Sequence, residues 1–325
     1  MNNIFLFIII SLLLSLAIDL TLGEMPTKVH PVVFIGRLIN YFKKIFININ
    51  NKLSGLLVVI SMTCISSVII YLICFILSIN NYLLFVVYTI LLSSTFSVNM
   101  LLKTAINVKN DLDINIDKAR QSVSYLVSRD TDELDEKFIV SATIESMTEN
   151  ITDSYTAVVF YYLLISIVIV KINSPDLLFL GLLIPYFYRI SNTMDAMLGY
   201  KTPELKNIGY VPAKLDDILN YIPSRLSGII MVLASWILRY DWRNAYKIMM
   251  RDARNCPSPN SGYTMATTAG CLNIQLIKKE TYVLGDDVNT ITKDDITRAV
   301  KLSEMTMFLF TLISTVIFVL IFKFA

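Results

Sequence analysis

The feature that most constrains this chain is a series of apolar runs of about the length that crosses a lipid bilayer. A membrane helix takes roughly 17–25 mostly apolar residues. The runs lie near residues 4–20, 55–78, 82–102, 155–170, 177–188 and 305–322. The runs at 155–170 and 177–188 are short, and the turn-forming KINSPD between them favours a helical hairpin. The pattern predicts an all-α integral membrane protein with about six membrane helices.

The composition supports this class. The chain is 55% hydrophobic and 17% charged, whereas soluble domains carry roughly 25% charged residues. The formal net charge of +2 favours neither nucleic acid nor an acidic partner. None of the four cysteines forms a CxxC pair, so no disulfide scaffold or zinc site is expected, and a reducing cytoplasmic face is compatible. The single histidine, His30, excludes a metal site built from several histidines of one chain.

Several segments allow more than one interpretation. The first apolar run could be the core of a signal peptide, but no Lys or Arg precedes it and no A-x-A-like site follows it, so we expect an uncleaved span. Residues 226–238 are too short to cross and are expected to form an interfacial or re-entrant helix. Residues 103–137 are expected to be a solvated helical connector, because their apolar positions are sparse.

An amphipathic helix is predicted from Asp241 to Arg254, with a basic and an apolar stripe. The basic stripe consists of Arg243, Lys247 and Arg251, and the apolar stripe of Trp242, Tyr246, Met249, Met250 and Ala253.

The basic residues predict the orientation in the membrane. All of the 28 Lys and Arg residues except Lys171 and Lys323 lie in polar segments on one side of the proposed spans. Basic loops face the cytoplasm in most membrane proteins. We therefore expect one polytopic domain, residues 1–325, in the cell membrane, with both termini outside. Its cytoplasmic loops and amphipathic helices would be residues 21–53, 103–154 and 189–304.

Three carboxylates recur at helical spacing in SATIESMTENITDSY. Glu145, Glu149 and Asp153 are separated by four residues, which on an α-helix places them within an arc of roughly 80°. Like charges at this spacing disfavour a bare helix. A divalent cation such as Mg²⁺ could neutralise them, since it binds carboxylate and phosphate oxygens. A solvated helix face explains the spacing equally well.

A second polar cluster runs from Arg189 to Arg225. Arg189, Asn192 and Asp195 follow at steps of three, so their side chains can meet on a helix that ends near Gly199. An Arg–Asp pair near lipid headgroups is the plain alternative. Further along, Asp216 and Asp217 are either metal ligands or favourable charges at a helix N-terminus.

The third cluster is RDARNCPSPNSG, residues 251–262. Its prolines force an extended backbone, and the small-residue helix expected after it makes the loop a candidate anion site. A capped interfacial loop is the alternative. The chain has no G-x-x-x-x-G-K-[ST], G-x-G-x-x-G or G-x-S-x-G motif. Bound nucleotide would therefore depend on carboxylate-held metal and scattered Arg and Lys residues. We expect the three clusters to meet on one side of the membrane in a single active site.

Five blocks of the sequence resemble the membrane-bound adenosylcobinamide-phosphate synthases of cobalamin biosynthesis. These are HPVVFIGRLI, ESMTENITDSYTAVVFYY, YRISNTMDAMLGYK, GYVPAKLDDILNYIPSRL and RDARNCPSPNSGY, in the order of that family and over almost the whole chain. Two positions depart from the family pattern. Met265 stands where members often carry glutamate, and Ile277-Lys278-Lys279 where they often carry paired glycines.

The resemblance implies an ATP-dependent ligase. It would join a carboxylate of adenosylcobyric acid to the amine of aminopropanol phosphate, or a similar amino alcohol phosphate. A carboxylate needs activation, so an acyl phosphate is the expected route, with Mg²⁺ as cofactor and ATP as co-substrate. Other enzymes of the cobalamin pathway are candidate partners, besides the corrinoid and the lipid bilayer.

Site residues are assigned on the same basis. The metal ligands would be Glu145, Glu149, Asp153, Asp216 and Asp217. The phosphate-binding residues would be Arg189, Lys201, Arg225, Arg251 and Arg254. Asn192, Asp195, Ser258 and Asn260 would act at the substrates. Two other functions stay open: a membrane transporter of a small anion, and a different membrane transferase acting on a phosphorylated alcohol. A transporter would place polar residues at mid-membrane in broken helices, whereas these clusters lie at the ends of the spans.

Overall fold

A computed structural model of the chain describes residues 2–324. Within that range, five helical stretches are long and apolar enough to cross a membrane. They are Asn3–Leu22, Lys52–Leu77, Asn81–Leu112, Glu136–Ile172 and Lys293–Lys323. These helices, and a single two-stranded sheet in the described range, confirm the expectation of an all-α membrane protein.

Contacts within the chain divide it into two compact units. Unit 1 comprises Met1–Ser97, Ala157–Leu219 and Ser314–Ala325. Unit 2 comprises Val98–Thr156 and Asn220–Ile313. The expectation of one polytopic domain stays a prediction.

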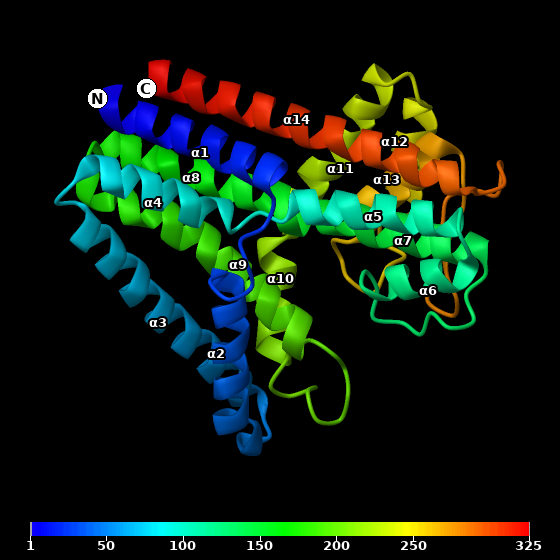
Figure 1. The fold of residues 1–325 in the computed structure, drawn as a ribbon, viewed down its shortest axis with the longest axis horizontal. Helices are drawn as coiled ribbons and strands as arrows, with labels where there is room; N and C mark the ends of the chain where they lie inside the picture. Colours follow the sequence, from blue (N-terminus) through cyan, green and yellow to red (C-terminus); the bar gives the residue numbers. More distant parts are fainter. Residues whose placement is uncertain (1, 325) are drawn as a thin grey trace. The chain divides into compact units, whose positions relative to one another are not determined.

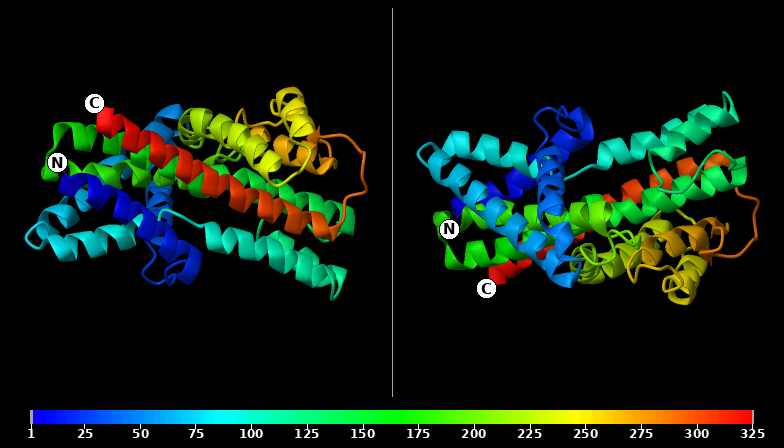
Figure 2. Two further views of the ribbon diagram at one scale, coloured as in Figure 1. Left: turned by 90° about the horizontal axis from the view of Figure 1, so that it is seen from above. Right: turned by 90° about the horizontal axis from the view of Figure 1, so that it is seen from below.

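Unit 1 is built from the apolar N-terminal helices and the middle of the chain. Its elements are α1 (Asn2–Leu22), α2 (Pro31–Phe46), η1 (Ile47–Ile49), α3 (Lys52–Leu77), α4 (Asn81–Ser93), α8 (Ala157–Ile172), η3 (Pro175–Phe179), α9 (Leu180–Leu198) and α10 (Tyr210–Leu219). Helix α1 packs against α4 and α8, and α9 packs against α2, α3, α8 and α10 (Figures 1 and 2). Asn51 and Asn80 cap α3 and α4 through their side chains, which sets where these two spans begin.

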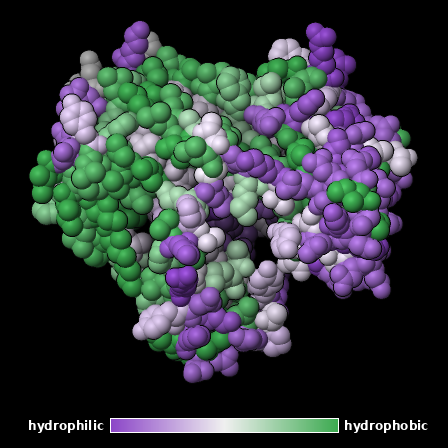
Figure 3. Space-filling model, in the orientation of Figure 1, coloured by the Kyte–Doolittle hydropathy of each residue, from purple (hydrophilic) through white to green (hydrophobic). Residues whose placement is uncertain are grey.

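The outer faces of α3 and α4 are apolar. Figure 3 shows hydrophobic side chains gathered over these two helices. Large residues such as Val68, Phe75 and Ile76 on α3 are exposed there. An exposed apolar surface of this extent is costly in water, whereas lipid tails cover it favourably. The surface therefore fits the membrane environment that the composition predicts.

Two of the expected spans differ from the structure. The run at 82–102 lies within the candidate span Asn81–Leu112, but it is interrupted by a turn, because α4 ends at Ser93 and the next helix, α5 (Val98–Leu112), begins only after it. The run at 177–188 is the first part of α9, which continues through Pro185 and past Arg189 to Leu198. Helix α9 is not among the five candidate spans, because its second half is polar and makes the helix as a whole insufficiently apolar.

The expected interfacial helix at 226–238 is α11 (Tyr221–Ile237). Neither α10 nor α11 alone is long and apolar enough to cross a membrane. Together they are, with a break at Asn220, which is the pattern of a broken span or a re-entrant segment. The segment 189–304, expected to be a cytoplasmic loop with amphipathic helices, is largely helical, because α10 to α13 and the first turns of α14 lie within it.

Unit 2 combines helices with one short hairpin. Its elements are α5, α6 (Ile116–Ser124), α7 (Glu136–Ile151), the π-helical turn η2 (Thr152–Thr156), α11, α12 (Trp242–Asp252), α13 (Gly262–Leu272), β1 (Leu276–Lys278), β2 (Tyr282–Leu284) and α14 (Lys293–Phe324) as far as Ile313. The strands pair antiparallel, with Leu276 opposite Leu284.

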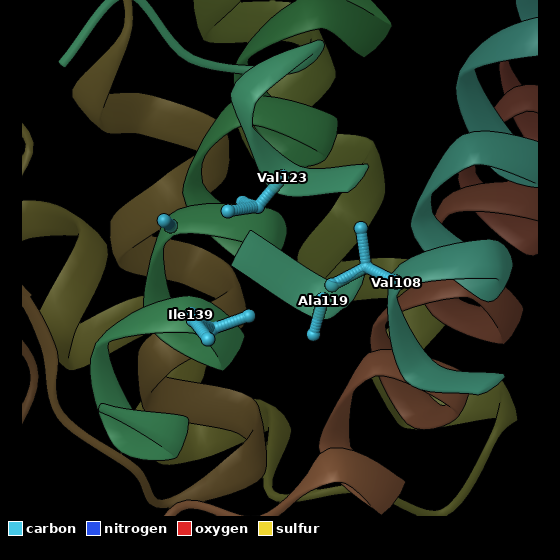
Figure 4. Packing of buried hydrophobic residues seen from close by; sticks show 5 residues of the cluster. Val108, Ala119, Val123 and Ile139 are labelled. Carbon is cyan, nitrogen blue, oxygen red and sulfur yellow. The ribbon is translucent and has the colours of Figure 1, made fainter. Parts of the chain in front are cut away.

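The segment expected to be a solvated connector has an apolar core of its own. Helices α5, α6 and α7 bury a common cluster (Figure 4). It consists of Val108, Ala119, Val123, Ile139 and Ala142. The segment is helical and largely exposed, as expected, but it is more than a solvated connector, because a few well-spaced apolar residues form a core when three short helices share them.

The amphipathic helix predicted from Asp241 to Arg254 is α12, and of its predicted apolar stripe Met249 and Ala253 are buried. Helix α13 packs against α12, and the buried residues are Ala245, Ile248, Met249 and Asp252. Trp242, Tyr246 and Met250 of the predicted apolar stripe are exposed. The close packing depends on small residues of α13: a Cβ on Gly262 would lie 2.1 Å from the carbonyl oxygen of Ala253.

Candidate functional site

A buried carboxylate lies at the centre of the polar residues of unit 2. Glu145 on α7 is only 3% exposed. Its Oε1 accepts a hydrogen bond from Ser141 Oγ at 2.5 Å. Its Oε2 accepts from Arg129 Nη2 at 3.2 Å and from the hydroxyl of Tyr282 at 2.9 Å. A buried charge is tolerated when it is paired and hydrogen-bonded in this way.

The β hairpin is attached to α7 through the same residues. Ser141 Oγ accepts from the backbone N–H of Ile277 at 2.8 Å, which fixes β1 beside α7. Tyr282 on β2 is then directed at Glu145. Burial raises the pKa of Tyr282 well above its usual range, and the negative charge of Glu145 raises it further. The phenol therefore stays a proton donor to the carboxylate at any physiological pH.

The three carboxylates predicted to bind a metal do not form a single cluster in the described residues. Among the residues described, 2–324, no group of three or more His, Cys, Asp or Glu side chains is placed to hold a metal ion. Both oxygens of Glu145 already accept hydrogen bonds from protein donors. Asp153 lies in the π-helical turn η2, where the α-helical repeat that would align it with Glu149 is interrupted. π-Helical turns are frequent at functional sites. The assignment of metal ligands stays a prediction, and the contacts of Glu145 argue against its own part in it.

The proline-containing loop is held by Arg225. The Nη1 of Arg225 donates to Asn260 Oδ1 at 3.1 Å and to the carbonyl oxygen of Tyr221 at 2.6 Å. Its guanidinium also lies over the rings of Tyr221 and Tyr263, at 3.5 and 4.5 Å from the centroids. Ser258 Oγ accepts from the backbone N–H of Asn260 at 3.3 Å, inside the loop. Arg225, predicted to bind phosphate, therefore positions the loop that leads into α13.

Arg251 is likewise engaged within the protein. Its Nε and Nη2 donate to the two oxygens of Asp252, and its Nη1 donates to Asp286 at 2.8 Å. Asp252, 4% exposed, also accepts from the backbone N–H of Gly285 at 2.9 Å. Burial alone would raise the pKa of Asp252, but the bonds from Arg251 and Gly285 outweigh it and hold the pKa below its usual value. These contacts join the end of α12 to the residues after β2.

Asp252 should make the stability of the protein sensitive to acid. A carboxyl group whose pKa is lowered by folding stabilises the folded state fully above its unfolded pKa, and that contribution is lost as the pH falls through the folded value. Asp252→Asn should therefore cost roughly 1–3 kcal/mol at pH 7 and flatten the decline of stability below about pH 4. Thermal unfolding of both proteins in detergent between pH 7 and pH 3 measures this. Equal acid sensitivity of the two would contradict it.

Two of the three sequence clusters meet in unit 2. Burial raises the pKa of the Cys256 thiol to about 12, while a bond to Ser261 lowers it and the charges of Glu149 and Glu145 raise it. Helix α13, into which the proline-containing loop leads, packs against α7, so this loop and the carboxylates of α7 belong to the same part of unit 2. Arg254, on the same loop, is exposed.

The cluster that runs from Arg189 to Arg225 belongs to unit 1 as far as Leu219, whereas Arg225 belongs to unit 2. Asn192 on α9 donates to Asp216 Oδ1 on α10 at 3.4 Å, so the two predicted residues do meet. A Cβ on Gly199, the C-cap of α9, would lie 2.0 Å from Oδ1 and 2.7 Å from the carbonyl oxygen of Asp195, so a larger residue there would displace the Asp195 carboxylate. Asp217 pairs with Lys214 at 3.0 Å. Lys201, between α9 and α10, is exposed. The meeting of all three clusters in one site stays a prediction.

Comparison with known proteins decides the family. The family model described as CobD/Cbib protein matches residues 12–303. The chain belongs to this family. It is 43% identical to a probable cobalamin biosynthesis protein CobD of Methanothermobacter thermautotrophicus, over 93% of this chain and 95% of that protein. It is 40% identical to the protein of the same name from Methanococcus aeolicus, over 87% and 89% of the two chains. The corresponding protein of Methanocaldococcus jannaschii is 35% identical, over 95% and 97%. No solved structure matches the chain.

The departures from the expected CobD/CbiB pattern lie beside the buried carboxylate. Met265 on α13 places its Sδ 3.8 Å from the hydroxyl of Tyr282. Ile277 and Lys278 belong to β1, and Lys279 begins the turn after it. Both departures therefore fall around Tyr282, where the hairpin meets α7 and α13.

Sequence analysis missed several residues whose hydrogen bonds join the elements of unit 2 in this CobD/CbiB chain. These are Arg129, Asp252, Tyr282 and Asp286. Asp252 stands in the RDARN run, and Asp286 in an LGDD run. A search for an acidic partner for each basic residue in a polar cluster would have pointed to Asp252. Arg129 and Tyr282 give no such signal, because their partner is far away in the sequence.

Proposed function

We propose that this CobD/CbiB family protein joins a carboxylate of adenosylcobyric acid to the amine of aminopropanol phosphate, or a similar amino alcohol phosphate, at the expense of ATP. The product would be adenosylcobinamide phosphate. The observation that carries the proposal is the family match over residues 12–303, with relatives named for cobalamin biosynthesis. The chain is thus assigned to cobalamin biosynthesis, and the ligation is our inference.

The residues of unit 2 support this chemistry. An ionised carboxylate is a poor electrophile, so the oxygen that leaves must first be transferred to phosphate. The N-terminus of α13, approached by the proline-containing loop, offers backbone N–H groups and a helix dipole to phosphate oxygens. Arg254 is an exposed cation on that loop. Glu149, partly exposed near Cys256, is our candidate for the base that accepts the proton of the ammonium nucleophile.

The remaining predicted residues have narrower parts in this proposal. Arg225 positions the proline-containing loop, Ser258 and Asn260 shape it, and Arg251 joins the end of α12 to the residues after β2. In unit 1, Asn192 and Asp195 would orient a substrate, and Lys201 would contact phosphate. We propose that magnesium accompanies the phosphates of ATP and meets at most one or two carboxylates, which is ordinary for this ion. No step depends on a metal held by Glu145.

The test is a ligation assay with the purified full chain in detergent. Adenosylcobyric acid, aminopropanol phosphate, ATP and Mg²⁺ should give adenosylcobinamide phosphate, detected by mass spectrometry, and none should form without ATP. Glu149→Gln should lower turnover by roughly 10²-fold, whereas Glu133→Gln, an exposed control in the loop before α7, should not. Uptake of a corrinoid or phosphate into vesicles without product would support a transporter. Product from another phosphorylated alcohol, but none from the corrinoid, would support a different transferase.

We also propose that the polar residues of unit 1 face the cytoplasm, because nearly all basic residues lie in the expected cytoplasmic segments. Cysteines introduced at Asn80 and Asn173, in turns at the ends of α3 and α8, should react with an impermeant thiol reagent from outside intact cells. A cysteine at Lys206 should not. The exposed Cys64 is first replaced by serine. Labelling at position 206 but at neither position 80 nor position 173 would show that the orientation is the opposite one.

A further inference from the structure

The only histidine of the chain caps a helix in a way that fixes its protons. His30 is the N-cap of α2, and its Nδ1 accepts the backbone N–H of Val32 at 3.2 Å. Because Nδ1 uses its lone pair as an acceptor, the proton of the neutral ring lies on Nε2. The ring therefore has one N–H donor left.

That donor has no acceptor among the residues described. His30 is 7% exposed, and its Nε2 is buried without a hydrogen-bond partner. Such groups are rare in folded proteins, because a buried donor without an acceptor keeps the full cost of losing water. An acceptor that is not part of this chain would remove that cost.

The charges around His30 indicate which kind of acceptor fits. Helix α2 packs against α9, which carries Arg189 (Figure 1). Burial lowers the pKa of His30, the Glu24 carboxylate raises it, and the Arg189 guanidinium lowers it, with a net decrease. The ring is thus neutral at pH 7. Glu24 is exposed and accepts a hydrogen bond from Ser97. A neutral donor beside a guanidinium and a helix N-terminus favours an anionic oxygen.

We infer that His30 Nε2 and Arg189 form a binding subsite for an oxyanion, a phosphate or carboxylate group, at the N-terminus of α2. This adds His30 to the residues assigned above. It rests on the proposed function only in that a phosphorylated substrate would supply the oxyanion at Arg189, which the family resemblance assigns to phosphate. The anion could belong to a soluble substrate or to a phospholipid headgroup, which share this chemistry.

The single histidine makes the test direct. The full chain, labelled with ¹⁵N-histidine, is solubilised in a non-ionic detergent, so its imidazole signals come from His30 alone. Inorganic phosphate or butyrate should shift the Nε2 signal in a saturable way. Arg189→Gln should weaken that binding about tenfold, the effect of losing one charge-assisted contact. Arg37→Gln, which removes an exposed cation of α2 lying over Phe34, should leave it unchanged.

A lipid source is separated from a soluble one in nanodiscs. A shift in phosphatidylglycerol discs but not in phosphatidylcholine discs, with none from soluble anions, assigns the oxyanion to a headgroup. A shift with soluble anions in either disc assigns it to a substrate. No shift of Nε2 under any of these conditions would overturn the inference. Because the signal needs no turnover, a failed ligation assay with an intact shift would refute the proposed function alone.

Two substitutions separate the cap from the donor. His30→Asn should keep the cap, since asparagine is a good N-cap, but cannot reach the Nε2 position. It should unfold at the wild-type temperature and lose the stabilisation that phosphate gives the wild type. His30→Gln carries an N–H group near Nε2 and should recover part of it. Wild-type stabilisation by phosphate in His30→Asn would contradict the inference, and the titration of the unmutated protein stands even if a variant fails to fold.

Discussion

Replacing Glu145 by alanine is expected to destabilise the protein by about 3 kcal/mol. The substitution leaves the guanidinium of Arg129 and the hydroxyl of Tyr282 without the acceptor that both share. It also removes the partner of Ser141, whose hydroxyl fixes β1. Breaking one half of a largely buried ion pair costs more than the pair itself contributes, because the remaining charge stays buried.

Unfolding by denaturant in detergent measures this effect. Tyr282→Phe, which removes one hydrogen bond to the same carboxylate, should cost roughly 1–2 kcal/mol. Glu133→Ala is the matched control, because Glu133 is exposed and its change should stay within about 0.5 kcal/mol. If Glu145→Ala lost no more stability than Glu133→Ala, the hydrogen bonds around Glu145 would not hold the hairpin to α7.

Replacing Gly285 by alanine should have a similarly large effect. Gly285 has φ of +82°, in the left-handed region, and its N–H donates to the buried Asp252. A Cβ there would lie 2.3 Å from the carbonyl oxygen of Ile274 and 2.9 Å from Cβ of Ala269. Backbone strain and the clash together should cost about 3 kcal/mol or more and loosen the contact between α12 and β2.

Gly36→Ala is the control for this glycine substitution. Gly36 lies inside α2, and the nearest atom to an added Cβ is Met197 Sδ at 3.7 Å, an ordinary contact. Alanine is the better helix former, so this change should be neutral or stabilise by up to about 1 kcal/mol. Thermal unfolding of the two variants compares them. A Gly285→Ala protein as stable as the wild type would show that the turn after β2 can move without loss.

The long apolar runs could be predicted because length and composition alone decide them. The helices α1 and α3 and the last part of α14, residues 305–322, follow from uninterrupted apolar sequence, and the asparagines at 51 and 80 are recognisable caps. The charged first turns of α14, from Lys293, were expected in the cytoplasmic loop instead. The run that became α9 was misjudged, because the polar residues from Arg189 onward look like the end of a span although they continue the same helix.

The hairpin around Tyr282 could not be predicted for a different reason. Its strands are three residues each, too short for a periodic signal, and they are held by contacts to α7 rather than by their own propensity. The same holds for the pairing of Arg251 with Asp286, which are 35 residues apart. The sequence made Arg225 and Arg251 candidates for phosphate binding, but it could not reveal that both have hydrogen-bond partners within the protein.

The fate of one carboxylate oxygen tests the central claim most directly. In the proposed reaction the corrin carboxylate attacks the terminal phosphorus of ATP, ADP leaves, and the amine then displaces phosphate from the acyl phosphate. One carboxylate oxygen therefore leaves on phosphate. With ¹⁸O in the carboxylate of adenosylcobyric acid, mass spectrometry should find label in inorganic phosphate in step with amide formation. Amide formed without label in phosphate would contradict the account, and label in AMP would identify an adenylate instead.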